Sequence, residues 1–314
     1  MRVVLPPTDA AMVAALAVVR HNLDVTPGLD GGAFVLKLET VQPTGSFKVR
    51  GALAAVSAAL AADPTGHVVT SSAGNHGLGV AWAARRLGAS ATVVVPQTAS
   101  AAKLEKLARF PIELVLAGTS YEEAEAAGLA RAAEGARFVS PYNDPHVIAG
   151  QATIAGELRA QVPDLRRVVV PVGGGGLISG IALALAGTGI EVVGVEVERS
   201  APMRAAYAAG VAVPITVGES LADGLAGNLE PGSVTIELVR AHVTDLVTVT
   251  EDEVAGAMRH LATEHGLIVE GSGAVGVAAV LAGHVAPVDG TTAVVVTGRN
   301  IDLRLLAEVL SGDR

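Results

Sequence analysis

A lysine in an unusual position is the first chemical feature of the sequence. Lys48 follows the run Thr44-Gly45-Ser46-Phe47, and the alanine-rich stretch 49–62 predicts a helix. The run begins with turn and capping residues, so we expect Lys48 in the first turn of that helix. The positive end of a helix and partial burial lower a lysine pKa, which suits Schiff-base chemistry with a carbonyl cofactor. On this segment alone, a surface lysine is the commoner explanation.

A glycine loop is the second feature. It is formed by Gly173, Gly174, Gly175 and Gly176. The loop lies between an apolar stretch, 167–172, and a predicted helix, so its backbone N–H groups are suited to binding an anion. A loose turn is disfavoured because ordering four glycines costs much entropy. A dinucleotide-binding loop would need Gly-x-Gly-x-x-Gly, but counting from Gly173 meets Ile178 and counting from Gly174 meets Ser179.

These segments resemble motifs of the pyridoxal-phosphate-dependent threonine dehydratase and serine racemase family. Segment 44–52 is similar to the family's lysine motif, and 171–180 is similar to its phosphate-binding loop. Segment 71–76, Ser-Ser-Ala-Gly-Asn-His, is similar to its asparagine loop, although a turn that only caps a helix over 78–87 is the commoner meaning of such a stretch. The motifs follow the family's order, so the similarity spans nearly the whole chain.

The resemblance implies a set of residues that bind pyridoxal 5'-phosphate. Lys48 would form the Schiff base, and Phe47 would pack beside the ring. The glycine loop, 173–176, would hold the phosphate, and the Asn75 amide would bind the phenolic oxygen. Thr297 would donate to the pyridine nitrogen. A neutral hydroxyl cannot keep that nitrogen protonated, which favours β-elimination over transamination.

The resemblance also implies how a substrate is held. Ser72, Asn75 and His76 would surround its carboxylate, and Lys48 would remove its Cα proton. In the serine racemases a serine directly before the Gly-Asn pair supplies the second proton, whereas Ala73 stands here. We therefore expect elimination to exceed racemisation; the alternative is a loop shifted by one residue, in which Ser72 reaches that position.

Several other positions have two interpretations. Glu270 is either close to the ring or a carboxylate at a helix start, and Arg299 either lines the pocket or points to solvent. The spacing of His260, Glu264 and His265 is one residue away from a metallopeptidase pattern, so we interpret it as a solvated helix end.

The resemblance bears on metal binding as well. Metal-dependent relatives have an aspartate six residues after the glutamate that corresponds to Glu196, whereas Pro202 stands here. We therefore expect no dedicated divalent-cation site, although Glu198 could compensate.

The elements that must position these residues alternate between strand and helix. This rhythm predicts an α/β fold with parallel sheets. A break at 141–145 divides the chain into a small domain, 66–143, and a large cofactor-binding domain, 1–65 with 144–314. The resemblance implies two parallel-sheet domains of the tryptophan-synthase-β-like fold, with the cofactor between them.

Composition limits the function classes. The chain has 314 residues, 50% of them hydrophobic, which is enough for one large or two moderate cores. A net charge of -9 argues against nucleic-acid or membrane partners. The absence of cysteine excludes disulfides and thiolate metal sites, and residues 1–8 lack the layout of a signal peptide. We therefore expect a cytoplasmic protein. The resemblance implies a homodimer that acts on a small amino-acid substrate.

The resemblance implies dehydration and deamination of threonine or serine to a 2-oxo acid and ammonia. A racemase, or a lyase for another β-substituted amino acid, is the alternative within the family, and a sulfhydrylase-like synthase ranks last there. A nucleotide-binding oxidoreductase or a non-catalytic sensor is the alternative from other classes.

Overall fold

The computed structural model describes residues 3–313, which form two compact units. The small unit contains 7–24 and 48–151, and the large unit contains the described parts of 1–6, 25–47 and 152–314. This division differs from the expected domains, because 7–24, 48–65 and 144–151 belong to the small unit. The reason is packing: apolar residues of these segments, such as Val19, Val56 and Val147, join Val68 of the small sheet in one core cluster.

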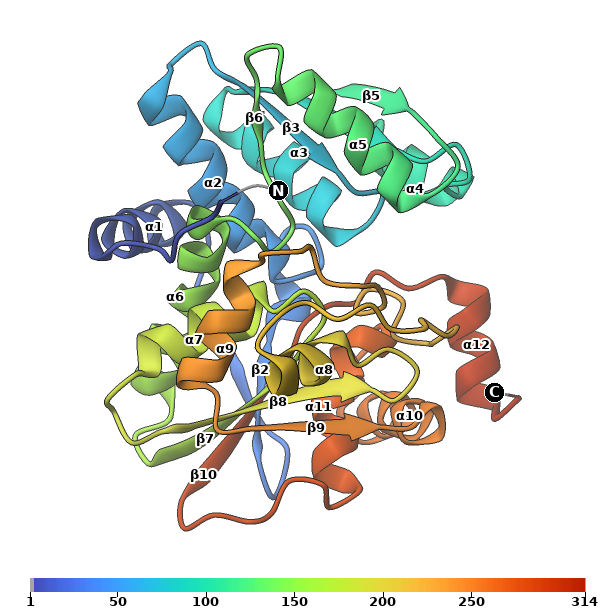
Figure 1. The fold of residues 1–314 in the computed structure, drawn as a ribbon. Helices are drawn as coiled ribbons and strands as arrows, with labels where there is room; N and C mark the ends of the chain where they lie inside the picture. Colours follow the sequence, from blue (N-terminus) through green and yellow to red (C-terminus); the bar gives the residue numbers. More distant parts are fainter. Residues whose placement is uncertain (1–2, 314) are drawn as a thin grey trace. The chain divides into compact units, whose positions relative to one another are not determined.

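The small unit is built on a parallel sheet, as the alternating pattern predicts. Within residues 3–313 this sheet has four strands in the order β5-β4-β3-β6. The strands are β3 (His67–Ser71), β4 (Ser90–Val95), β5 (Glu113–Leu116) and β6 (Arg137–Phe138). The helices are α1 (Asp9–Asn22), α2 (Lys48–Ala62), α3 (Asn75–Leu87), α4 (Ala101–Leu107) and α5 (Tyr121–Ala132). Helix α6 (Pro145–Gln161) contains the boundary between the units, at 151/152. Figure 1 labels these elements.

The large unit is built on a second sheet. In the described part of the chain it has six strands in the order β1-β2-β10-β7-β8-β9, and only the edge strand β1 is antiparallel to its neighbour. The strands are β1 (Gly28–Asp30), β2 (Val35–Leu38), β7 (Leu165–Pro171), β8 (Glu191–Val197), β9 (Asp245–Val249) and β10 (Thr291–Val296). The short helix η1 (Glu39–Val41) follows β2.

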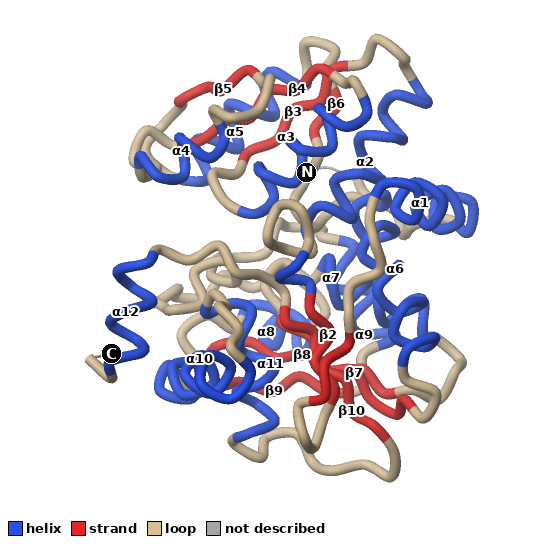
Figure 2. Tube along the Cα trace, turned by 180° about the vertical axis from the view of Figure 1, so that it is seen from behind, coloured by secondary structure: helices blue, strands red, loops and turns tan. Residues whose placement is uncertain are grey.

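Helices cover both faces of this larger sheet. They are α7 (Gly176–Leu185), α8 (Pro202–Ala209), α9 (Val234–His242), α10 (Glu251–His265), α11 (Gly271–Leu281) and α12 (Leu303–Ser311). Figure 2 shows the strands of this sheet in red from the opposite side, with α10 and α11 labelled beside them.

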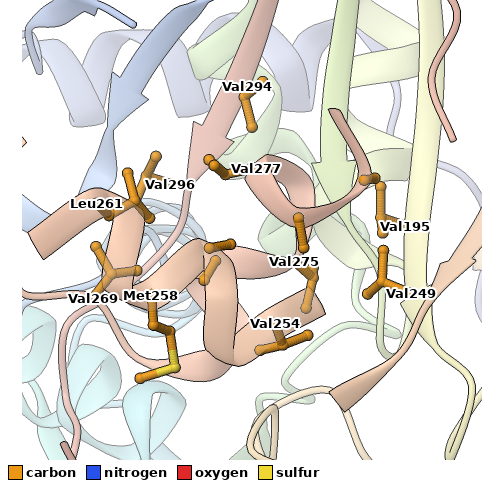
Figure 3. Close-up of a cluster of buried hydrophobic side chains, with 14 of the residues drawn as sticks. Val195, Val249, Val254, Met258, Leu261, Val269, Val275, Val277, Val294 and Val296 are labelled. Carbon is orange, nitrogen blue, oxygen red and sulfur yellow. The ribbon is translucent and has the colours of Figure 1, made fainter. Parts of the chain in front are cut away.

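Side chains alternate between the two faces along the central strands, as a period of two requires. In β10, Val294 and Val296 join a cluster with α10, α11 and α12, whereas Ala293 and Val295 join a cluster with α7, α8 and α9. Figure 3 shows part of the first cluster, in which Met258 of α10 lies near Val254 and Val269 and the sheet contributes valines such as Val294 and Val296. The sheet is therefore buried on both faces, and the loops at its strand ends are left for other tasks.

Most predicted element boundaries agree with the structure to within two residues. Thr8 caps α1, and Thr250 with Glu253 forms a capping box at the start of α10, an arrangement that the residue types at these positions favour. The prediction for α3 was wrong: the helix begins at Asn75 rather than at Leu78. Helices α8, α9 and η1 and strands β1 and β6 were not predicted from the sequence.

Candidate active site

Lys48 is the first residue of α2, which confirms its predicted place in the first turn of a helix. The side chain is partly buried, and its Nζ donates a hydrogen bond of 2.9 Å to the carbonyl oxygen of Pro141. Pro141 lies in the predicted break at 141–145, but its role as a partner of Lys48 was not predicted. The carbonyl fixes where the lysine amine points.

The asparagine loop folds back over the start of α3. Gly74 is the N-cap residue, so Asn75 and His76 lie in the first turn of the helix and not in a preceding turn. Gly77 permits this early start, because a Cβ atom there would lie 2.0 Å from the carbonyl oxygen of Ser72. The Ser72 hydroxyl accepts a hydrogen bond of 3.2 Å from the Gly74 N–H and can donate its own proton elsewhere. The three residues expected to bind a carboxylate thus lie within five positions of one loop and helix start.

His76 is buried and neutral. The residue is 3% exposed, and its Nε2 is 3.1 Å from the carbonyl oxygen of Val139. Burial, followed by the positive charge of Lys48, lowers the pKa of His76 to about 3, although the carbonyl acts in the opposite direction. Because a carbonyl only accepts, Nε2 carries the proton and Nδ1 is an acceptor, and Nδ1 has no hydrogen-bond partner within residues 3–313. His76 is therefore not a general acid at neutral pH.

The glycine loop joins β7 to α7 in the large unit. Gly175 is the N-cap of α7, with φ of 85°, and no side chain of the described residues caps this helix end. A Cβ atom on Gly173 would lie 3.0 Å from the Leu225 backbone, and one on Gly175 would lie 2.5 Å from Met203 Cε. The loop therefore requires glycine, and it ends in backbone donors at a helix N-terminus, a donor set that fits a phosphate group.

Two segments predicted to bind the cofactor lie side by side in the large unit. Phe47 N–H donates to the Thr297 carbonyl oxygen at 3.0 Å, and Ser46 forms an isolated antiparallel bridge with Gly298. Asn300 Nδ2 donates to the Thr44 carbonyl oxygen at 2.8 Å. Backbone and side-chain hydrogen bonds thus connect the turn after β10 to the segment that precedes Lys48.

Buried hydroxyl groups gather at this turn. Thr297 is 3% exposed, and its Oγ1 lies 3.4 Å from the Ser272 carbonyl oxygen, which is a long hydrogen bond. The Ser46 and Ser272 hydroxyls are buried without hydrogen-bond partners among residues 3–313. Such donors fit the polar edge of an aromatic cofactor. Phe47 packs against the apolar cluster of α7 and β7, and its side chain is partly buried.

Glu270 and Arg299 have structural roles at the same turn. Glu270 Oε2 accepts a hydrogen bond of 3.0 Å from Asn300 N–H, and Glu270 N–H donates to the Gly298 carbonyl oxygen at 3.1 Å. Its carboxylate therefore buttresses the turn that follows Thr297. Arg299 is exposed, and its backbone N–H donates to the Gly45 carbonyl oxygen at 2.9 Å.

Glu196, which was considered for metal binding, accepts hydrogen bonds from the start of α8. Glu196 is fully buried, and its two carboxylate oxygens accept hydrogen bonds of 2.8 and 2.7 Å from the N–H groups of Met203 and Arg204. Burial raises the pKa of Glu196 to about 7, against the effect of these hydrogen bonds and of the Arg204 charge. Within residues 3–313, no group of three or more His, Cys, Asp or Glu side chains is arranged to hold a metal ion. The expected lack of a dedicated cation site stays a prediction.

The pair His260 and His265 forms an edge contact between rings, with centroids 5.4 Å apart. Glu264 beside them is exposed. Among the described residues, no helix has the length and apolar character needed to cross a membrane.

Sequence reasoning missed one residue that touches the glycine loop. Thr235, the second residue of α9, donates a hydrogen bond of 2.8 Å from its Oγ1 to the Gly174 carbonyl oxygen. The two residues are separated by 61 positions, and α9 itself was not predicted. The only signal in the sequence is Ser233, a typical N-cap residue, two positions earlier.

Comparison with known proteins shows similarity to pyridoxal-phosphate-dependent enzymes over most of the chain. A family model described as pyridoxal-phosphate dependent enzyme matches residues 21–298. The chain is 42% identical over 285 residues to the L-threonine ammonia-lyase of Thermotoga maritima, covering 90% of this chain and 70% of that protein. It is 37% identical over 284 residues to the catabolic L-threonine dehydratase of Escherichia coli K12, covering 88% and 86%. Among solved structures, maize serine racemase is similar, with a TM-score of 0.90, 29% identity and 98% of each chain covered.

Proposed function

Because the chain belongs to the family of pyridoxal-phosphate-dependent enzymes, we propose that it is an ammonia-lyase that converts L-threonine or L-serine to a 2-oxo acid and ammonia. The observation that carries the proposal is the 42% identity to an L-threonine ammonia-lyase over 90% of this chain. The first-turn position of Lys48, with its amine held by the Pro141 carbonyl, supports it. Such an amine suits the covalent role that the family's chemistry requires.

The proposal assigns the cofactor contacts to particular groups. Lys48 Nζ holds the cofactor covalently, and the N–H groups of the glycine loop, 173–176, hold its phosphate. Thr297 Oγ1 donates to the pyridine nitrogen, the Asn75 amide binds the phenolic oxygen, and Phe47 packs beside the ring. The buried hydroxyl of Thr297 and the uncapped start of α7 support these assignments.

The reaction then divides between the cofactor and the chain. Bound pyridoxal phosphate withdraws electrons from the substrate Cα and so makes its proton removable. The substrate amine would first displace Lys48 Nζ from the cofactor, and the freed Nζ would then take that proton, while Ser72, Asn75 and the backbone of His76 would bind the carboxylate at the start of α3. A neutral His76 leaves the lysine as the base of this site, because a pKa of about 3 keeps the imidazole from exchanging protons at neutral pH.

A screen of β-hydroxy amino acids for 2-oxo acid release tests the function. The wild-type protein should show a visible absorption band with pyridoxal phosphate, and it should release 2-oxobutyrate from L-threonine or pyruvate from L-serine. Lys48→Ala should remove the band and lower turnover by at least about 10³-fold, with the thermal midpoint nearly unchanged, because the lysine supplies chemistry and not packing. Borohydride reduction should leave the cofactor attached to Lys48. Release of no 2-oxo acid by the wild-type protein from any β-hydroxy amino acid would refute the proposal.

Amino-acid racemisation is the second candidate, because a serine racemase is among the similar structures. Measuring D-serine and pyruvate from the same L-serine reaction separates the two activities.

The proposal extends to a cytoplasmic homodimer. Exposed apolar side chains of the large unit, such as Val211 at 61% and Tyr207 at 37%, provide surface that an interface would cover. Light scattering on the eluted protein should give twice the mass of the chain, and cell fractionation tests the compartment.

A further inference from the structure

Two hydroxyl groups at the start of α9, those of the N-cap residue Ser233 and of Thr235, lie behind the glycine loop. Thr235 is fully buried, and its Oγ1 lies 2.8 Å from the Gly174 carbonyl oxygen and 2.7 Å from Ser233 Oγ. The carbonyl oxygen can only accept, so Thr235 gives its proton to Gly174. The Ser233 hydroxyl must then donate to Thr235. The direction of both hydrogen bonds is therefore fixed.

This contact sets the orientation of one peptide group. A trans peptide is planar, with its C=O and N–H pointing in opposite directions, and none of the described peptide bonds is cis. When Thr235 holds the Gly174 oxygen on the α9 side, the N–H of Gly175 points to the other side. Gly175 has φ of 85° and ψ of 0°, so its left-handed conformation leads into the first turn of α7.

The side of the loop that faces α9 is filled. A Cβ atom on Gly175 would lie 2.5 Å from Met203 Cε and 3.1 Å from the Thr235 Cβ. Met203 is fully buried, and its N–H is held by Glu196. The opposite side carries the Gly175 N–H, followed by the N–H groups of the first turn of α7, for which no side chain of the described residues provides a cap. Successive N–H groups in such a conformation form a concave anion site.

We propose that Thr235 is a positioning residue for the cofactor phosphate, which it serves by fixing the Gly174–Gly175 peptide with its N–H directed at the phosphate. The inference rests on the proposed function, in that the anion is the phosphate of pyridoxal phosphate. A loop of four glycines has little intrinsic preference for one peptide orientation, since glycine populates both signs of φ about equally. An external hydrogen bond is therefore what selects the binding orientation.

The test compares two ligands that differ only in the phosphate. The protein freed of cofactor is titrated with pyridoxal 5'-phosphate and with pyridoxal, and both dissociation constants are measured by absorbance. Thr235→Val keeps the shape of the side chain but removes the hydroxyl. It should weaken pyridoxal phosphate binding about 10-fold, as expected for loss of a well-aimed hydrogen bond to an anion, and change pyridoxal binding less than 2-fold. Thr235→Ser retains the hydroxyl and should bind both ligands like the wild type.

A spectroscopic readout accompanies the titration. The ³¹P resonance of the bound cofactor should move toward that of free pyridoxal phosphate in Thr235→Val, and it should stay at the wild-type position in Thr235→Ser. If the valine does not fit, Thr235→Ala gives the same comparison.

Three outcomes would overturn the inference. The first is a Thr235→Val protein that binds pyridoxal phosphate like the wild type. The second is an equal loss for both ligands, which would mean a general disturbance of the site. The third is a Thr235→Ser protein as weak as Thr235→Val. A wild-type protein that binds neither ligand would instead refute the proposed function, and the inference with it.

Discussion

The segment 139–141 connects two residues of the candidate site through its carbonyl groups. Val139 accepts hydrogen bonds from Thr70 Oγ1 and from His76 Nε2, at 2.8 and 3.1 Å, and Pro141 accepts from Lys48 Nζ at 2.9 Å. Because the backbone between these carbonyls is short, His76 and Lys48 are coupled through a shared support as well as through charge.

The buried neutral His76 predicts a loss of stability in acid. Its pKa is about 3 in the folded protein and 6.5 in an unfolded chain, so between these values the unfolded state binds more protons. The contribution of neutral His76 to the free energy of unfolding is fully present above pH 6.5 and is lost as the pH falls toward 3. At pH 5 the loss amounts to about 2 kcal/mol.

His76→Gln should flatten this dependence, because a glutamine amide can donate to the Val139 carbonyl without titrating. The measurement is urea unfolding at pH 7 and pH 5, followed by the fluorescence of Trp82, which is the single tryptophan and lies in the same unit. An unchanged difference between the two pH values in the variant would mean that another group titrates in this range.

Ala73 predicts the balance between elimination and racemisation. Its methyl group packs against the apolar cluster of Leu78, Val93 and Val95, and it has no proton to exchange. The neighbouring Ser72 hydroxyl accepts from the Gly74 N–H, and the proposed function assigns its own proton to the substrate carboxylate rather than to the Cα. Pyruvate should therefore accumulate from L-serine with little D-serine beside it.

Ala73→Ser should raise the ratio of D-serine to pyruvate by at least about 10-fold, since a positioned acid contributes a factor of 10² or more to proton transfer. Chiral chromatography of initial-rate samples gives the ratio, and Ala73→Thr serves as a bulkier hydroxyl control. Comparable rates of both products in the wild type would show that another residue supplies the second proton.

For single residues of the site, the sequence predicted the features that depend on neighbouring residues in the chain. The capping residues before Lys48 indicated its place in a helix turn, and the run of glycines indicated the loop before α7. The partners of these groups could not be predicted. Pro141 is 93 positions from Lys48, and Thr235 is 61 positions from Gly174, so only the folded chain brings them together.

Among the elements, α3 shows how one glycine decides where a helix starts. Helix propensity is low in the stretch 74–77, which contains two glycines and an asparagine, so the sequence indicated a turn there. The absence of a Cβ atom at Gly77 lets the Ser72 carbonyl approach the helix, and the helix then begins at Asn75. Tertiary packing overrides propensity at this position.

Gly77→Ala should therefore destabilise the protein although alanine favours helices. The added Cβ would lie 2.0 Å from the Ser72 carbonyl oxygen, so backbone must move, at a cost of roughly 1–3 kcal/mol. Displacement of Ser72 should also raise the KM for the substrate several-fold.

Gly256→Ala in α10 is the matched control. A Cβ atom there meets nothing within 4 Å, so this variant should gain up to about 1 kcal/mol of stability from helix propensity. Thermal unfolding followed by far-UV circular dichroism compares the two. A stabilised Gly77→Ala protein would mean that the loop 72–74 adapts without cost.

Helix α8 could not be predicted because the group that caps it lies on a different element. Its start depends on Glu196, at the end of β8, whose carboxylate accepts the N–H groups of Met203 and Arg204. A cap supplied from a neighbouring strand leaves no signal next to the helix, which is why 202–209 was not predicted from the sequence. Glu196 thereby holds Met203 behind the glycine loop.

For the molecule as a whole, the sequence predicted two α/β parts, and the structure has two compact units whose bounds differ from the predicted ones. Helices α1 and α2 instead pack on the small sheet, through residues such as Val19 and Val56. The unit that a helix joins depends on packing against residues far away in the sequence, and the local hydrophobic pattern does not identify those residues.

Two units with separate cores predict unfolding in more than one step once the cofactor is removed. Each sheet is covered by its own apolar clusters, and proteins of this kind depart from two-state behaviour. Trp82 packs in the small unit, so its fluorescence reports on that unit alone, whereas far-UV circular dichroism reports on both. In urea the two midpoints should differ by roughly 0.5 M or more. Gly77→Ala should shift the fluorescence transition, and Gly256→Ala should shift only the part of the dichroism curve that fluorescence does not follow. Superimposable curves in all three proteins would show that the cores unfold as one cooperative structure.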